Sequence, residues 1–372
     1  MNSQRNTPLY DTEMNFYRGR VGLYYILKAL GIKEGDHVYL QAFTCVAVPE
    51  AILACGASPV YIDIEADGYN LDIIDLEKKV SNLGRAIIVQ HTFGIPADLG
   101  EIKMIADKMH IPIIEDCCHT YESTYNSRPV GTIGVAAFYS HEWGKPIVVG
   151  IGGSVRINDL DLQVKMESMM PLLQFPSTLK TIQIQLQYFM FKLLYRPRFY
   201  WPIRSFFRLL SARGIAEGNY NAVRKGVVSN DFELKMPSYL AARLKRKILL
   251  LPKISSYSKK SSNAYKDGIK GVNIVHPKLP VNAEVVFARY PLRVKNKEQL
   301  LLLAQQNNIE MADWYSTPVH PKLGDQLLEV EYEPGSCPNA ESRCAEVVSL
   351  PLHQNVTSNN INSTISFING VE

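Results

Sequence analysis

The stretch Tyr139-Ser-His-Glu-Trp-Gly-Lys145-Pro-Ile-Val-Val-Gly-Ile-Gly-Gly153 places one lysine among glycines, just after the apolar run 136–140. An earlier apolar run, Ile111-Pro-Ile-Ile-Glu-Asp116, ends in an aspartate. In open α/β sheets, functional groups gather at the carboxyl ends of strands, which is where Asp116 falls. The stretch and the aspartate therefore predict a site built at the edge of a sheet.

This pair of residue types suits one cofactor, pyridoxal 5'-phosphate. A lysine amine forms a Schiff base with the cofactor aldehyde, and a buried carboxylate keeps the pyridine nitrogen protonated so that the ring accepts electrons. We assign these roles to Lys145 and Asp116. The alternative is that neither residue binds a cofactor, because an aspartate after a strand usually caps a turn and a lysine in a loop is usually solvated.

The first half of the chain alternates short apolar runs with helical patterns. Such alternation is typical of a mainly parallel sheet with helices on both faces, and it predicts the α/β class. Gly31 and Gly56 stand where glycines end helices. The expected strands are 38–41, 59–64, 86–90, 111–115, 136–140 and 153–157, and the expected helices are 23–30, 46–55 and 99–109.

The second half has a different pattern. A helical run at 239–251 precedes strand candidates near 272–275 and 285–292, and a helix at 298–307 leads into a proline-rich tail. We expect a large cofactor-binding domain over residues 1–235 and a smaller α+β domain over 236–372. No internal repeat or low-complexity tract is present.

Separated blocks of sequence, in one order over nearly the whole chain, resemble the DegT/DnrJ family of sugar aminotransferases. They are Gly31-Ile-Lys-Glu-Gly-Asp36, Ala42-Phe-Thr44, Gly56-Ala-Ser-Pro-Val-Tyr-Ile-Asp63, His91-Thr-Phe-Gly-Ile-Pro-Ala-Asp98, Ile114-Glu-Asp-Cys-Cys-His119 and Gly152-Gly153. The resemblance implies fold type I, a homodimer with active sites at the subunit interface, and amination of nucleotide-linked keto-sugars with glutamate as the usual donor. It matches Asp116 to the pyridine partner, Ser140 to a phosphate contact and Lys145 to the Schiff-base lysine.

The phosphate end of the site departs from the family pattern. Tyr17-Arg-Gly-Arg-Val-Gly22 opens a helix whose amides and positive dipole can face an anion. Gly19 and Arg20 stand where the family has Gly-Thr, and a guanidinium can bind phosphate through two hydrogen bonds. Lys235 lies where relatives carry a segment that reaches across the dimer to the phosphate. We expect Gly19, Arg20 and Lys235 to contact the cofactor.

The ring end departs as well. Cys45 takes the place of an aromatic residue over the cofactor face, and His119 stands where the family usually has Gln. We expect both to border the cofactor, with His119 contacting the ring or its phenolic oxygen. The neighbours of the lysine, 141–143, also differ from common relatives. They either shape the substrate pocket or pack the loop.

Composition indicates an ordinary enzyme of 372 residues with 46% hydrophobic and 20% charged residues. A net charge of +4 is too small to imply nucleic acid by itself. The start, Met1-Asn-Ser-Gln-Arg-Asn-Thr-Pro, is polar, and no uncharged apolar run has the length of a bilayer span, so we expect a cytoplasmic protein. The six cysteines lack paired metal spacing, and we expect no metal.

Three classes of function remain open from the sequence. The first is an aminotransferase that makes an amino sugar for a surface polysaccharide or glycoconjugate. The second is a dehydratase or lyase of the same fold, although relatives that dehydrate sugars tend to replace the lysine by histidine. The third is a non-catalytic binding protein on a degenerate fold. Retention of Asp116, Ser140 and Lys145 together favours the first class.

The segment 178–213 is the part that the resemblance explains least. It carries seven lysines and arginines and nine aromatic residues without one acidic residue, and Pro197 and Pro202 are expected to break it into two short helical pieces. Cations among aromatic rings suit an anionic membrane surface. Alternatively, the rings pack under the small domain or in the dimer contact while the cations stay solvated. The sequence favours the second interpretation, since large exposed aromatic patches are rare.

Overall fold

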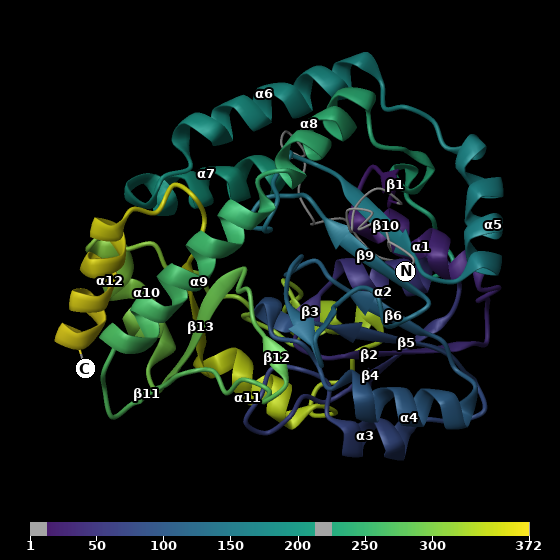
Figure 1. The fold of residues 1–372 in the computed structure, drawn as a ribbon, viewed down its shortest axis with the longest axis horizontal. Helices are drawn as coiled ribbons and strands as arrows, with labels where there is room; N and C mark the ends of the chain where they lie inside the picture. Colours follow the sequence, from purple (N-terminus) through teal and green to yellow (C-terminus); the bar gives the residue numbers. More distant parts are fainter. Residues whose placement is uncertain (1–12, 213–224, 372) are drawn as a thin grey trace, which may run out of the picture.

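The apolar runs of the first half form a seven-stranded sheet with the order β1-β10-β9-β6-β5-β2-β4 (Figure 1). The computed structural model describes residues 13–212 and 225–371. The strands are β1 (Glu13–Phe16), β2 (His37–Gln41), β4 (Ser58–Ile62), β5 (Gly84–Gln90), β6 (Ile113–Asp116), β9 (Ala136–Ser140) and β10 (Gly153–Ile157). The neighbouring strands β4, β2, β5, β6 and β9 pair in parallel. At one edge of the sheet, β10 pairs antiparallel with β9 and with β1. The predicted mainly parallel sheet is confirmed.

Helices connect the parallel strands and cover both faces of this sheet. They are α1 (Gly19–Ala29), α2 (Ala47–Ala54), α3 (Ile73–Lys79) and α4 (Leu99–Met109), and α5 (Leu160–Met169) follows β10. On β2, Val38 and Leu40 pack with α1 and α2, whereas Tyr39 packs on the α3 and α4 side. Successive side chains of a strand point to opposite faces. Apolar runs without alternation therefore indicate a sheet whose two faces are both covered by helices.

A buried carboxylate, Glu115, supports this sheet from the face opposite the candidate site. Its oxygens accept hydrogen bonds from the backbone N–H groups of Gly131, Ile133 and Gly134 at 2.6, 2.7 and 2.8 Å, and lie 3.1 Å from the His91 imidazole. Burial raises the pKa of Glu115, but His91 and the backbone donors outweigh this effect, and the pKa is lowered overall. The carboxylate therefore stays charged and holds the loop before β9 in place.

A second, smaller sheet organises the C-terminal part of the chain. It contains β11 (Ile274–Val275), β13 (Arg289–Val294) and β15 (Val347–Pro351), all antiparallel, and α9 (Leu251–Gly268), α10 (Lys297–Gln306), α11 (Pro338–Glu346) and α12 (Ser358–Val371) accompany it. Short pairs β3 (Thr44–Cys45) with β14 (Val319–His320), and β7 (Thr124–Tyr125) with β8 (Arg128–Pro129) and β12 (Ala283–Glu284), tie the two parts together. The division of the chain at residue 235 stays a prediction.

Two sequence expectations for this part were wrong in detail. The sequence predicts one helix over 239–251, but the structure divides this run. α8 (Ser238–Ile248) ends at Ile248, and α9 begins at Leu251. The proline at 252 lies in the first turn of α9, where no helical hydrogen bond needs its missing N–H. The strand expected at 285–292 begins only at Arg289, because the Val286 N–H binds the Ser123 hydroxyl and the Ala288 N–H binds the Phe93 carbonyl instead of a neighbouring strand.

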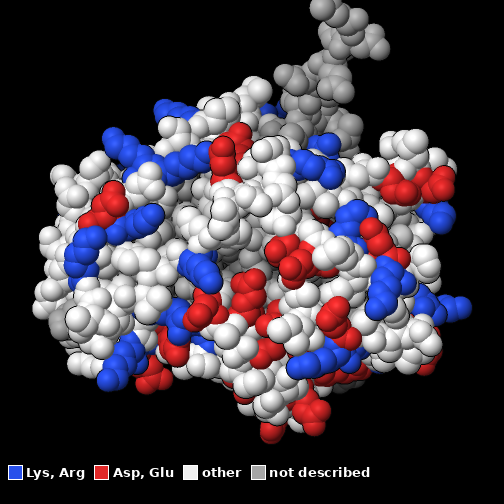
Figure 2. All heavy atoms as spheres, turned by 60° about the horizontal axis from the view of Figure 1, so that its bottom comes forward, with Lys and Arg blue, Asp and Glu red and all other residues white. Residues whose placement is uncertain are grey.

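The segment 178–213 forms two helices along the rim of the molecule beside α8 (Figure 1). These are α6 (Thr178–Leu194) and α7 (Tyr200–Ala212), and Arg213 lies outside the described residues. Pro197 separates the helices as expected, but Pro202 does not break α7, since it occupies the first turn. Among the described helices, none has the length and apolar character needed to span a bilayer. Figure 2 shows acidic and basic side chains interspersed over one face of the molecule.

We expect Glu115→Ala to lower the free energy of unfolding at pH 7 by about 3 kcal/mol or more, because three buried N–H donors lose their acceptor and each such loss costs about 1–3 kcal/mol. Because the pKa of Glu115 is lower in the folded than in the unfolded protein, the carboxylate stabilises the fold at pH values above its ordinary pKa. This contribution disappears as the pH falls. The deficit should therefore shrink below about pH 4.

Urea unfolding followed by circular dichroism at pH 7 and at acidic pH measures both effects. Glu77→Ala, which removes an exposed carboxylate from α3, is the matched control. Equal stability of Glu115→Ala and Glu77→Ala at pH 7 would contradict the supporting role of Glu115.

Candidate active site

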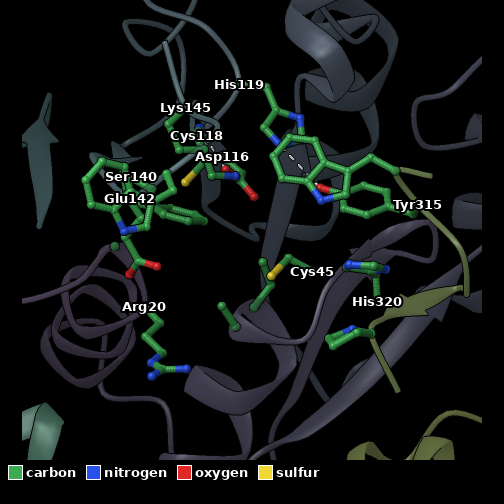
Figure 3. Close-up of a pocket in the computed structure, with 17 residues that line it drawn as sticks. Arg20, Cys45, Asp116, Cys118, His119, Ser140, Glu142, Lys145, Tyr315 and His320 are labelled. Carbon is green, nitrogen blue, oxygen red and sulfur yellow. Dashed lines mark hydrogen bonds between the residues drawn. The ribbon is translucent and has the colours of Figure 1, made fainter. Parts of the chain in front are cut away.

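A cavity of about 190 Å³ lies at the carboxyl edge of the large sheet (Figure 3). Seven of the eight residues expected from the sequence line it: Gly19, Arg20, Cys45, Asp116, His119, Ser140 and Lys145. Figure 3 shows Asp116, Cys118 and Lys145 together on one side of the cavity and Arg20 on another. The tertiary structure thus brings together groups that are up to 126 positions apart, from Gly19 to Lys145.

Strand ends and a helix start position the polar groups. Asp116 is the last residue of β6, Ser140 is the last residue of β9, and Lys145 follows in the connection to β10. Because β6 and β9 pair in parallel with Asp116 opposite Phe138, their carboxyl ends meet at the same edge. Gly19 begins α1 directly after β1.

The Asp116 carboxylate is almost fully buried. Burial raises its pKa, while a 2.9 Å hydrogen bond from the Cys118 N–H to Oδ1 and the charge of Lys145 act in the opposite direction. A cation placed against Asp116 would remove the cost of burying this charge, since buried carboxylates need a partner. The carboxylate is therefore suited to a protonated ring nitrogen.

The start of α1 is packed backbone to backbone against the strand pair β9 and β10. A Cβ on Gly153 would lie 2.3 to 2.4 Å from backbone atoms of Arg18 and Gly19, and a Cβ on Gly19 would lie 3.0 Å from the Tyr139 carbonyl. Glycine at both positions leaves the first amides of α1 next to Ser140. Helix N-termini of this kind are ready-made anion sites, which fits the phosphate of the cofactor.

The Arg20 guanidinium also fits that phosphate. Its Nη1 donates to Glu50 at 2.6 Å and its Nη2 lies 3.7 Å from Asp231, yet Nε and Nη2 are buried and make no hydrogen bond with the described residues. Buried donors without acceptors are costly, so an anion in this cavity would satisfy them. Glu50 and Asp231 were not foreseen from the sequence, because nothing in their local pattern relates them to Arg20.

Aromatic rings line the opposite wall. His119 lies between Trp314 and Phe93 in stacked geometry, with ring centroids 5.3 and 6.2 Å away. Its Nδ1 accepts the Phe93 N–H at 3.1 Å, so the neutral ring carries its proton on Nε2, which is 3.3 Å from the Tyr315 hydroxyl. Burial lowers the pKa of His119 well below its ordinary value. A neutral ring donating through Nε2 faces the site.

Several lining residues were missed or misread in the sequence. Cys118 borders the cavity, and so do Trp314 and His320 from the C-terminal part. Among the neighbours of the lysine, Trp143 lines the cavity, whereas His141 is fully buried against Tyr121 and Ser154, and burial lowers its pKa to about 3.

Lys235 does not reach this cavity within one chain. Its amine lies 4.1 Å from the ring centroid of Phe175, and its backbone N–H binds the Gln174 carbonyl. The expected contact between Lys235 and the phosphate is thus not made by the same copy of the chain. Only a site shared between two copies would leave it a role.

The mainly parallel sheet, the buried acid at the end of β6 and the lysine after β9 are those of a pyridoxal phosphate-dependent aminotransferase of fold type I. The model of the DegT/DnrJ/EryC1/StrS aminotransferase family matches residues 16–369. The chain therefore belongs to this family, and the resemblance drawn from the sequence is confirmed.

Similar proteins include enzymes that act on activated sugars. The chain is 34% identical over 160 residues, 43% of either chain, to GDP-perosamine synthase of Escherichia coli O157:H7. It is 26% identical over 338 residues to UDP-2-acetamido-2-deoxy-3-oxo-D-glucuronate aminotransferase of Pseudomonas aeruginosa, covering 90% of this chain and 79% of that protein. Its fold matches DesV of S. venezuelae with a TM-score of 0.74 at 23% identity, covering 96% and 84% of the two chains.

We expect Gly153→Ala to weaken binding of pyridoxal phosphate at least tenfold, because the added Cβ would push the first turn of α1 away from β10. Spectrophotometric titration of the stripped protein with the cofactor measures the affinity. Gly370→Ala is the matched control, since a Cβ there meets no atom within 4 Å. Unchanged cofactor affinity in a folded Gly153→Ala protein would show that this close approach does not shape the site.

Proposed function

We propose that this enzyme transfers an amino group from glutamate to the keto carbon of a nucleotide-linked sugar, in the synthesis of a surface polysaccharide or glycoconjugate. The single observation that carries the proposal is the meeting of Lys145, Asp116, Ser140 and the start of α1 around one cavity. The named relatives support the sugar part, because both act on nucleotide-linked sugars or form one.

Each end of the cofactor has a matching group in the cavity. Lys145 would hold the aldehyde carbon, Asp116 the ring nitrogen, and Ser140, Gly19 and Arg20 the phosphate. Cys45 and His119 would border the ring. Pyridoxal phosphate supplies a carbonyl carbon that accepts nitrogen and a conjugated ring that withdraws electrons from the neighbouring carbon.

Lys145 would then act as the acid and base of the reaction. Once the amino donor has displaced it, its Nζ would take a proton from the α-carbon of the donor and deliver it to the former aldehyde carbon, on the other side of the transferred nitrogen. In the second half of the reaction it moves a proton to the sugar carbon. Its Nζ lies 5.0 Å from the ring centroid of Trp314, so the indole limits its movement and screens it from water.

We expect Lys145→Ala to abolish the borohydride-reducible absorbance of the bound cofactor while the protein stays folded. Asp116→Asn should keep some cofactor but lose turnover at least tenfold, since a charge-assisted buried hydrogen bond contributes about 1.5–3 kcal/mol. Absorbance spectra and a glutamate half-reaction measure the two effects.

Lys103→Ala and Asp107→Asn, which change an exposed pair on α4, are the matched controls. A reducible covalent adduct in Lys145→Ala would refute the role of the lysine. Near-normal turnover in Asp116→Asn would refute that of the acid.

We further propose a homodimer with shared active sites, as the family resemblance implies. Lys235 is the weakest link of this proposal, because its amine lies over Phe175 and does not reach the cavity of its own chain. A second copy would have to bring its own Lys235 to the phosphate. A monomer with full activity at micromolar concentration is incompatible with this arrangement.

The outer face of α6 favours a second proposal, peripheral contact with an anionic membrane at the cytoplasmic surface. Leu179, Ile182, Leu186, Phe189 and Leu193 follow one another at three- and four-residue spacing and are all more than half exposed. The sequence from 168 to 216 contains no acidic residue, and the exposed Lys192, Arg196 and Arg198 lie at the end of this stripe.

Five other aromatic rings of the segment are packed inward, whereas Phe199 and Phe206 are 45% and 60% exposed. Tyr200 and Trp201 are buried, and Tyr188, Phe191 and Tyr195 are half-buried. The two interpretations drawn from the sequence thus apply to different faces. An apolar stripe with adjoining cations matches an anionic bilayer, in which apolar groups enter the interface and cations bind lipid phosphates.

We expect the protein to float with vesicles of 30% phosphatidylglycerol at low salt and not with neutral phosphatidylcholine vesicles. Leu186→Glu with Phe189→Glu should abolish flotation, because the stripe loses apolar area and gains repulsion from the lipid. Leu160→Glu, a change at a 78% exposed leucine of α5, is the control. Failure to float, or a dimer that becomes monomeric in the double variant, would assign the stripe to a different contact.

A further inference from the structure

The loop 141–152, which carries Lys145, is closed at its base by its own backbone. Two hydrogen bonds of 2.9 Å link His141 to the rest of the loop, one from its N–H to the Gly152 carbonyl and one to its carbonyl from the Val149 N–H. Three of the twelve residues in the loop are glycines, which leave the backbone between these contacts little stiffness. The position of Lys145 therefore depends on contacts between the loop and other elements.

Cavities lie on both sides of this loop. Glu142, Trp143 and Lys145 border the active-site cavity, and residues 143–148 border a second cavity of about 390 Å³. Packing against the loop is thus incomplete on either side. We call the second cavity the cation cavity, because the described residues that border it include no acid but five cations, Lys145, Lys192, Arg196, Lys247 and Arg289.

The inner face of α6 contacts the loop through aromatic rings. The Trp143 ring stacks on Tyr188 of α6, with ring centroids 5.8 Å apart, and contacts Phe191, with ring centroids 3.6 Å apart. Such ring pairs have preferred geometries, so the place of α6 determines that of the indole. Because Trp143 is two residues before Lys145, a shift of α6 reaches the lysine directly.

Arg243 of α8 joins the loop to α6. Its Nη1 donates to the Val149 carbonyl at 2.9 Å, and its Nη2 donates to the Gln185 side chain of α6 at 2.7 Å. The guanidinium also lies 3.8 Å from the centroid of the Tyr188 ring. A planar guanidinium holds two acceptors and a ring in one fixed arrangement, which the single ammonium of a lysine cannot do.

The charges between α6 and α8 oppose their contact. Lys192 of α6 and Lys247 of α8 border the same cavity. Burial lowers the pKa of Lys247, and the charges of Arg243 and Lys192 lower it further. Since like charges repel, α6 stays on α8 only where other contacts outweigh this repulsion. The contacts of Arg243 with Gln185 and Tyr188 have that effect.

We infer that Arg243 is a positioning residue for Lys145, because it fixes the loop through the Val149 carbonyl and seats the helix on which Trp143 packs. Arg243 borders neither cavity, so it acts without touching substrate or cofactor. The inference rests on the proposed function, in which the lysine amine moves a proton between two carbons. It assigns a catalytic purpose to the seat of α6, in the segment that the family resemblance explains least.

Arg243→Met tests this inference, because methionine keeps an unbranched apolar stem and removes the guanidinium. We expect the rate of the glutamate half-reaction per bound cofactor to fall roughly 10- to 100-fold, since a displacement of about 1 Å can cost about 100-fold. The KM for glutamate and the borohydride-reducible absorbance should stay close to those of the wild type. Arg243→Lys should recover part of the rate, because its ammonium can still reach one acceptor.

Amide hydrogen exchange of the full chain gives a readout that does not depend on activity. In Arg243→Met we expect faster exchange in the loop 141–152 and in α6, with β6 and β9 unchanged. Gln185→Ala removes only the contact with α6 and should speed exchange in the same two segments, which keeps the inference testable if Arg243→Met does not fold. Arg246→Met is the matched control, since Arg246 is exposed on the same helix.

The outcomes separate positioning from a general structural role. An unchanged half-reaction rate or unchanged loop exchange in folded Arg243→Met would overturn the inference. So would an equal loss of rate in Arg246→Met, or exchange that rises evenly over the whole chain. Absence of the glutamate half-reaction in the wild type would instead defeat the proposed function, while the exchange of the loop would still report whether Arg243 holds it.

Discussion

The adjacent carboxylates Glu115 and Asp116 give the two faces of strand β6 different roles, support of a loop and lining of the cavity. Because successive side chains of a strand face opposite sides, Glu115 is directed to the 131–134 loop and Asp116 to the cavity. Buried charges persist only when they are satisfied. Glu115 takes its partners from the protein, whereas Asp116 has one backbone donor and the nearby Lys145 charge. The first carboxylate fixes the approach to β9, and with it the positions of Ser140 and Lys145 relative to the second.

The start of α1, where we propose that the phosphate binds, depends on a similar balance between close packing and charge. Gly19 and Gly153 allow α1 to begin against β10, and the arginines that follow are held by acids from distant parts of the chain. Arg18 pairs with Glu142 and Asp231, while Arg20 pairs with Glu50 and keeps two donor atoms without acceptors. Such a cluster keeps the guanidinium of Arg20 in place before an anion arrives, so little reorganisation is needed on binding.

The helix α6 gives the chain two surfaces that differ in chemistry. Its inner face contributes rings and a cation to the cavity beside Lys145, and its outer face exposes an apolar stripe. The helix is anchored to α8 by the hydrogen bond from Arg243 to Gln185. Binding at one face would then be sensitive to displacement of the helix at the other. Within the described chain, this helix and α7 are the elements least accounted for by the family pattern.

The sequence by itself determined the parallel sheet and most of its helices through local periodicity, and it indicated the cofactor class through Asp116 and Lys145. The expectation that Cys45, His119 and Ser140 line the cavity came from the family resemblance. The sequence could not determine the partners of Arg20, the aromatic wall formed by Trp314 and Tyr315, or the cation cavity next to Lys145. Most of these depend on contacts between positions more than a hundred residues apart, such as Glu310 with Tyr195 and His119 with Tyr315, and Glu50 is 30 positions from Arg20. Local pattern carries no record of such distances, since only packing of the two sheets and the rim helices brings the groups together.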